Sequence, residues 1–110
     1  MTNVPYRQTY ENYEIAVIPV GDEFDVRFMI KGQDQSYNIE WCKNKHHAVE
    51  GAKRFPMFYE IALRHGYHLQ HSEFRHPDGR IVDYSYAMDL DRTEASFEQL
   101  LVHGISPNPL

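Results

Sequence analysis

The chain has little cysteine, little positive charge and no long apolar run. Cys42 is the only cysteine in 110 residues, which excludes an internal disulfide framework and favours a reducing compartment. Eleven Lys and Arg against sixteen Asp and Glu give a net charge of -5, which disfavours general binding to nucleic-acid phosphates. No apolar run approaches the ~18 residues of a membrane span, and the first residues lack a signal-peptide pattern. We therefore expect a cytoplasmic protein without a membrane partner.

The motifs of common enzyme classes are also missing. The sequence contains no Gly-x-Ser-x-Gly, no glycine-rich phosphate loop, no Cys-x-x-Cys and no His-Glu-x-x-His. Cys42 has His46 and His47 nearby in the sequence, a neighbourhood that can activate a thiol. Lone cysteines in small intracellular domains are mostly packing residues, however. We assign no catalytic residue and no cofactor, and we favour a protein that is not an enzyme.

The composition nevertheless supports a folded core. Hydrophobic residues make up 42% of the chain and aromatic residues 14%, far from the polar composition of disordered segments. Because domains usually contain ~100 to 200 residues, we predict a single domain over 1–110. Residues 1–12 are predicted to form an N-terminal arm that packs through Tyr6 and Tyr10, and 106–110 a loose tail.

The first half of the chain is predicted to form an antiparallel meander. β-branched enrichment or a period of two, with turn signals between the segments, marks three strands: 13–20, 24–31 and 36–42. The same alternation places four aromatic residues on the buried side of the sheet: Phe24, Phe28, Tyr37 and Trp41.

After Asn44 the apolar period changes to three and four residues, which predicts a helix over 45–65. Pro56 is expected to kink or break this helix, and Gly66 to end it with a left-handed cap. Further extended and helical patterns predict two strands and a short helix: 67–75, 80–87 and 92–103. The order β-β-β-α-β-β-α predicts an α+β domain with one antiparallel sheet and both helices packed on one face.

Histidine is concentrated in the segment 65–76, which holds four of the seven histidines. Together with a carboxylate, these provide candidate metal ligands: His68, His71, Glu73 and His76. Successive residues of a strand point to opposite faces, so one strand cannot gather three ligands without help from elsewhere. We favour a solvated or partly packed strand face, with a histidine-rich metal-binding protein or small metal-dependent enzyme as the alternative.

Basic residues gather near the start of the long helix and are candidates for binding a partner or an anion: Lys43, Lys45, His46, His47, Lys53 and Arg54. Cations at a helix N-terminus oppose the helix dipole, and a solvated helix start is the simpler interpretation. This group supports a second alternative, a nucleic-acid-binding or antitoxin-type regulator, which the negative net charge disfavours.

The leading hypothesis is a non-enzymatic binding or assembly module that forms a homodimer. Open sheet edges invite pairing, and an apolar row on the last predicted strand offers a second surface: Val82, Tyr84 and Tyr86. An unidentified protein partner is compatible with the same surfaces.

Overall fold

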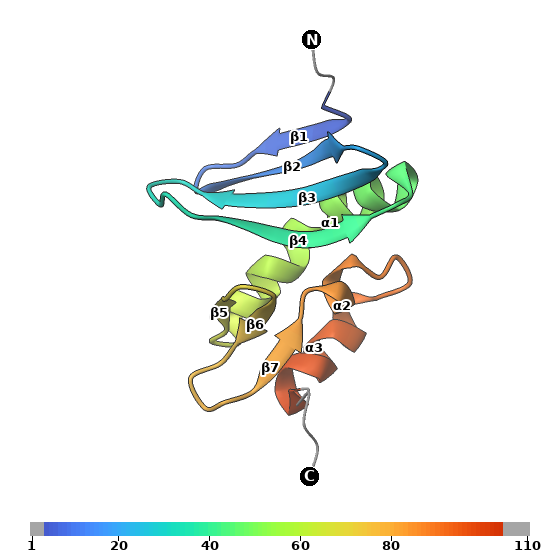
Figure 1. The fold of residues 1–110 in the computed structure, drawn as a ribbon. Coiled ribbons are helices and arrows are strands. Elements are labelled where there is room, and N and C mark those ends of the chain that lie inside the picture. Colours follow the sequence, from blue (N-terminus) through green and yellow to red (C-terminus); the bar gives the residue numbers. More distant parts are fainter. Residues whose placement is uncertain (1–3, 105–110) are drawn as a thin grey trace.

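The computed structural model describes residues 4–104 and shows an α+β fold with two antiparallel sheets and three helices in that range (Figure 1). The first sheet has four strands that pair in sequence order: β1 (Tyr6–Thr9), β2 (Tyr13–Val20), β3 (Glu23–Ile30) and β4 (Ser36–Cys42). The remaining elements are α1 (Lys45–Arg64), β5 (His68–Leu69), β6 (Glu73–Arg75), β7 (Ile81–Asp83), α2 (Ser85–Met88) and α3 (Glu94–His103).

The four-stranded sheet confirms the three strands predicted in the first half, with bounds that agree to within a residue. The arm prediction is wrong in part, because residues Tyr6–Thr9 form β1 and place Tyr6 opposite Val17 of β2. β1 is an edge strand with mostly exposed side chains, so it lacks the alternation that marks a half-buried strand. Tyr6 and Tyr10 pack against the core as predicted.

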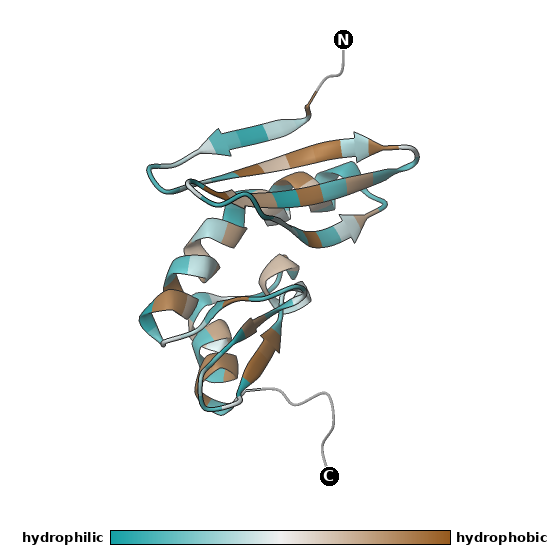
Figure 2. Cartoon of the chain, turned by 60° about the vertical axis from the view of Figure 1, so that its left-hand side comes forward, coloured by the Kyte–Doolittle hydropathy of each residue, from teal (hydrophilic) through white to brown (hydrophobic). Residues whose placement is uncertain are grey.

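Helix α1 covers one face of this sheet and continues into the C-terminal half of the molecule (Figure 2). It begins at the predicted N-cap, where the side chain of Asn44 accepts a hydrogen bond from the backbone N–H of His47. The helix continues through Pro56, so the predicted alternative of a break is wrong. Pro56 is buried together with its neighbours Phe55 and Phe58, and their packing offsets the backbone hydrogen bond that proline cannot make. Gly66 follows the helix with a φ of 86°, as predicted.

The C-terminal half does not extend the first sheet, which corrects the single-sheet prediction. The predicted strand 67–75 is a hairpin of β5 and β6, and the predicted strand 80–87 contains only β7 before the chain enters α2. The helix predicted over 92–103 is present as α3, but it packs against α1 and β7 rather than on the four-stranded sheet. The predicted tail 106–110 lies outside the described residues.

Aromatic rings connect the two sheets through α1. Phe28 of β3 lies 5.3 Å from Phe55 of α1, which in turn stacks on Phe74 of β6 with ring centroids 5.8 Å apart. Phe74 then meets Phe97 of α3 edge-on at 5.9 Å. All four rings are almost completely buried, so one continuous core supports both halves of the chain.

Candidate functional site

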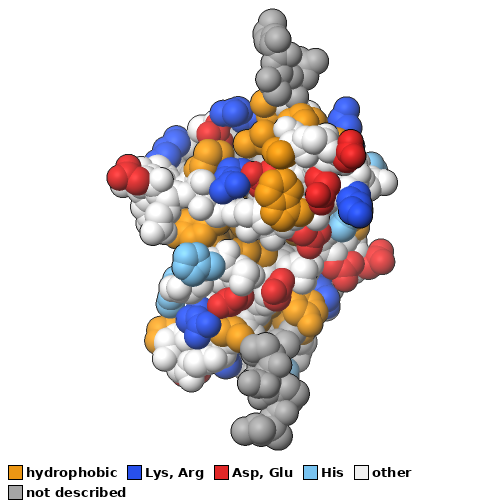
Figure 3. Space-filling model, in the orientation of Figure 1, with side chains coloured by type: hydrophobic (Ala, Val, Ile, Leu, Met, Phe, Trp, Pro, Cys, Tyr) orange, Lys and Arg blue, Asp and Glu red, His pale blue; other side chains and the backbone are white. Residues whose placement is uncertain are grey.

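The face of the four-stranded sheet opposite α1 is not covered by any described helix or strand (Figures 1 and 3). A β-bulge in β4 determines part of this face. Arg27 pairs with Asn38 but Val26 pairs with Glu40, so β4 contains one extra residue at this point. The extra residue reverses the inside-outside alternation. Trp41 therefore points away from α1 and is 49% exposed, which corrects its predicted burial beneath the helix.

We call this surface the open face and define it by the residues whose strand positions point away from α1: Arg7, Thr9, Glu14, Ala16, Ile18, Val20, Glu23, Asp25, Arg27, Met29, Ser36, Asn38 and Trp41. Hydrophobic side chains are interspersed there with charged ones of both signs (Figure 3). At its centre Asp25, only 5% exposed, accepts two hydrogen bonds from Arg27 and one from Asn38.

The three residues predicted to form a dimer surface do not lie in an exposed row on one strand: Val82, Tyr84 and Tyr86. Val82 and Tyr84 are 0% and 1% exposed, and Tyr84 donates a hydrogen bond from its hydroxyl to the backbone carbonyl of Gln70. Tyr86 belongs to α2, with the guanidinium of Arg92 over its ring. The alternation that suggested a strand continues across a strand-to-helix junction, so Val82 and Tyr84 belong to the core and are not accessible to a second molecule.

The predicted metal ligands lie on β5, β6 and the adjoining loops: His68, His71, Glu73 and His76. Within residues 4–104 they do not form a group of three close ligand atoms. Glu73 pairs with Arg75 at 2.9 Å, and hydrogen bonds from neighbouring side chains lower the pKa of its carboxyl. His76 instead lies against Asp78 at 2.9 Å and meets the ring of Tyr67 edge-on.

The basic residues predicted to form a binding group at the start of α1 make separate contacts or remain exposed: Lys43, Lys45, His46, His47, Lys53 and Arg54. Lys53 pairs with Glu50 on the same helix. Arg54 donates to backbone carbonyls in the connection between α2 and α3 and lies over the ring of Phe58. His47 is bonded through Nε2 to the carbonyl oxygen of Met88. Lys43, Lys45 and His46 are exposed.

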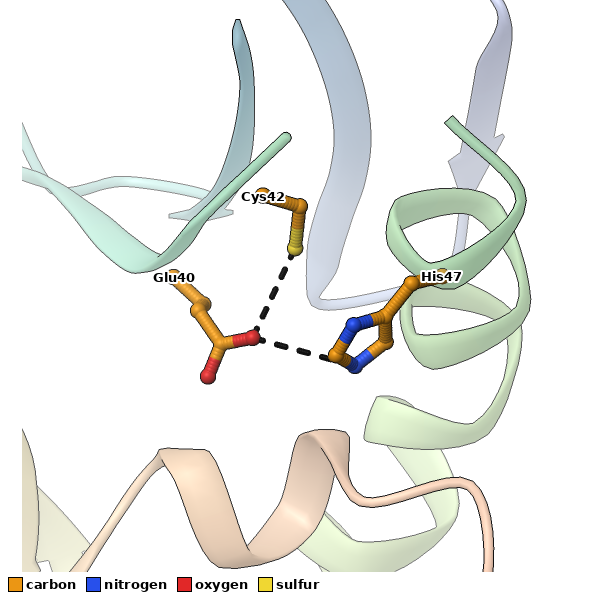
Figure 4. A group of neighbouring side chains, drawn as sticks. All are labelled: Glu40, Cys42 and His47. Atoms are coloured by element: carbon orange, nitrogen blue, oxygen red, sulfur yellow. Dashed lines mark hydrogen bonds and ion pairs between the residues drawn. The ribbon is translucent and has the colours of Figure 1, made fainter. Parts of the chain in front are cut away.

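A different set of side chains comes together where β4 meets α1. Glu40, Cys42 and His47 each offer one ligand atom, and these atoms lie within 4.8 Å of one another (Figure 4). The thiol of Cys42 donates to Glu40 Oε2 at 3.5 Å, and the same oxygen lies 3.8 Å from Nε2 of His47. Within residues 4–104 this is the one group of three such residues that meets this distance.

The bulge and the helix cap together position this group. The bulge turns Cys42 toward α1, where it is 4% exposed, and the Asn44 cap places His47 in the first turn of the helix, facing the end of β4. Sequence reasoning noted that Cys42 and His47 are neighbours but missed Glu40. The available signal is a Glu-x-Cys strand end followed by a helix cap and a histidine three residues after that cap.

The thiol of Cys42 is poorly suited to nucleophilic catalysis. Burial and the carboxylate of Glu40 raise the pKa of Cys42 to about 12, so the thiolate is scarce near neutral pH. The imidazole of His47 is bonded to a backbone carbonyl rather than to the sulfur. The arrangement is therefore not a base-activated cysteine.

A groove of about 560 Å³ lies next to this group, between the start of α1 and the residues around α2. Most of its lining residues have polar side chains: Asn44, His46, His47, Ser85, Asp89, Leu90 and Asp91. His47 thus lies between the buried thiol of Cys42 and a groove lined by the carboxylates of Asp89 and Asp91. These carboxylates disfavour an anionic ligand in the groove.

Comparison with known proteins yields no match to a family model, a curated protein or a solved structure. Among residues 4–104, no helix combines the length and the hydropathy that crossing a bilayer requires. The open face and the group at Cys42 are therefore the two features of the structure that bear on function.

Proposed function

We propose that the protein is a non-enzymatic binding module of the cytoplasm that assembles with a second copy of itself through the open face. The observation that carries this proposal is the exposure of Trp41, 49%, on a sheet face that no helix or strand of residues 4–104 covers. Tryptophan is enriched at the energetic centres of protein interfaces, because it buries a large area at low conformational cost. Val20, 48% exposed, extends the apolar part of the same face.

The charges of the open face favour a copy of this chain over a polyanion. Arg7 pairs with Glu14 at 3.2 Å, and Arg27 pairs with Asp25 at 2.7 Å. Both arginines are already neutralised within the face, so they offer little to a phosphate backbone. Two arginines against three carboxylates, with Glu23 beside Val20, leave the face only weakly negative, so two chains of net charge -5 can approach there without strong repulsion.

The size of the face supports a reversible dimer. Strands ~4.8 Å apart and about eight residues long, at ~3.3 Å per residue, form a face of roughly 400–500 Å². Stable interfaces bury ~800 Å² per partner, and transient ones bury less. We therefore expect dissociation on the order of micromolar concentrations.

The single tryptophan makes the proposal directly measurable. Since Trp41 is the only tryptophan, its fluorescence emission should shift to the blue as concentration rises and the indole is covered. Light scattering after size exclusion should show the mass rising from one chain to two over the same range. A monomer at high micromolar concentration, with constant emission, contradicts self-association.

Two valines provide a matched test of the surface. Val20 lies on the open face and Val102 on α3, with exposures of 48% and 49%. Val20→Asp should weaken dimerisation by roughly 10-fold or more, because it buries a charge in the interface. Val102→Asp should leave the mass distribution unchanged. Equal effects of the two substitutions would contradict the assignment to the open face.

A further inference from the structure

The group at the end of β4 has the composition of a metal site rather than of a simple surface cluster. Glu40, Cys42 and His47 contribute an oxygen, a sulfur and a nitrogen from two different elements, and one of the three is almost fully buried. We propose that these residues form a binding site for a thiophilic divalent cation, with Zn²⁺ as the best match. This site is distinct from the open face and goes beyond the proposed self-assembly.

The donor set selects the class of cation. Thiolate and imidazole favour Zn²⁺ over Mg²⁺ or Ca²⁺, which prefer oxygen ligands alone. Binding converts the Cys42 thiol to a thiolate, and its proton leaves to solvent without any redox change. One thiolate and one carboxylate together cancel the charge of the dication, which matters at a partly buried position.

The distances require only a small adjustment. Tetrahedral Zn²⁺ with bonds of ~2.0–2.3 Å holds its ligand atoms ~3.4–3.6 Å apart. The Cys42 sulfur and the Glu40 oxygen are already 3.5 Å apart. All pairs of ligand atoms in the group lie within 4.8 Å. A shift of roughly 1 Å therefore brings the group to coordinating geometry.

The imidazole of His47 is oriented by the backbone. Nε2 lies 2.9 Å from the carbonyl oxygen of Met88, and because a carbonyl only accepts, Nε2 carries the proton. The lone pair of the neutral ring then lies on Nδ1, on the side of the ring that faces Cys42 in Figure 4. A metal-bound histidine typically donates its other N–H to a carbonyl or carboxylate in this way.

The group adjoins the groove through one of its ligand residues. His47 lines both the group and the groove of about 560 Å³, so a cation can reach the site from solvent and retain a water ligand. Three protein ligands and an open position are typical of a Zn²⁺ site that accepts a further ligand. The carboxylates of Asp89 and Asp91 in the groove attract a cation toward it.

Cobalt titration of untagged protein tests the proposal, because Co²⁺ replaces Zn²⁺ and reports sulfur coordination in its spectrum. We expect saturable binding of one Co²⁺ per chain, with a thiolate-to-cobalt charge-transfer band that Zn²⁺ removes by competition. Cys42→Ser should abolish the band, and His47→Gln should weaken Co²⁺ affinity at least ~10- to 100-fold, the loss that removal of even an outer partner causes.

The matched control is His46→Gln, which changes an adjacent groove residue outside the group. It should leave the band and the affinity unchanged, as should His68→Gln on β5. Circular dichroism of each variant verifies that the fold is retained. Absence of saturable binding, or binding that both Cys42→Ser and His47→Gln leave intact, overturns the site. Val20→Asp, which should weaken dimerisation, should bind Co²⁺ with the same stoichiometry and band, so failure of self-assembly does not affect this test.

Discussion

The N-terminal region (residues 6–42) and the C-terminal region (residues 67–103) satisfy their polar groups in different ways. Strands of up to eight residues let the N-terminal region pair its backbone in regular ladders. Its polar side chains are then free to bond with one another, as Asp25, Arg27 and Asn38 do on the open face. The result is a scaffold whose surface chemistry can vary without disturbing the backbone pairing.

The C-terminal region has strands of only two or three residues, so many of its carbonyl groups have no ladder partner. Long side chains donate to them instead. The last carbonyls of α3 lack partners within the helix, and Tyr67 donates to that of Leu101 while Arg80 donates to those of Leu101 and Val102. Arg54 of α1 does the same for three carbonyls of the connection from α2 to α3: Asp89, Leu90 and Arg92. The stability of this region therefore depends more on individual side chains than that of the N-terminal region does.

The largest expected effect comes from the ring that joins the two regions. Phe55 is 0% exposed and contacts rings of both sheets, so Phe55→Ala should lower the free energy of unfolding by about 3–5 kcal/mol. Urea denaturation followed by Trp41 fluorescence and by circular dichroism should show one shared transition. The exposed Leu63→Ala on the same helix should cost less than ~0.5 kcal/mol. Separate transitions for the two probes would show that the regions fold independently.

The second effect tests the side-chain network of the N-terminal region. Asp25→Ala removes the acceptor of Arg27 and Asn38 at a buried position, and we expect a loss of roughly 2–3 kcal/mol in urea denaturation. Glu14→Ala removes the exposed pair with Arg7 and should cost at most ~1 kcal/mol. If both substitutions cost the same, the buried network contributes no more than a surface pair.

The same contrast explains which elements could be predicted from the sequence. β2, β3 and β4 are long, and in β3 the apolar residues Phe24, Val26 and Phe28 alternate with charged ones, so their local pattern carries the information. In the C-terminal region Tyr84 is placed by a hydrogen bond to Gln70 and by contact with Phe74. Such distant partners leave no periodic signal, and the alternation around Tyr84 therefore suggested a strand where a helix begins.

The candidate site was only half predictable for a related reason. The proximity of Cys42 and His47 follows from the strand end and the Asn44 cap, which are local features. The position of Glu40, and the outward orientation of Trp41, depend on one extra residue in β4. A bulge is decided by pairing with a neighbouring strand and has no signature within β4 itself.

The third effect tests the carbonyl-bonded organisation of the C-terminal region. Arg54→Leu retains an apolar stem against Phe58 but removes the donors to three carbonyls. We expect a loss of about 2 kcal/mol, with faster hydrogen exchange confined to amides near α2 and α3. Lys53→Met, which breaks an exposed pair with Glu50, should change stability by less than ~0.5 kcal/mol. Faster exchange spread evenly over the four-stranded sheet would contradict this local role.

The smallest effect compares two glycines with the same backbone angle, one inside the N-terminal region and one immediately before the C-terminal region. Gly32 and Gly66 both have a φ of 86°, which costs a residue with a side chain about 1 kcal/mol. A Cβ at Gly32 meets nothing within 4 Å, whereas one at Gly66 lies 3.0 Å from His76 Nε2. That ring is held by Asp78 and cannot move away freely. Gly66→Ala should therefore lower Tm further than Gly32→Ala, and equal shifts would mean that the His76 ring gives way.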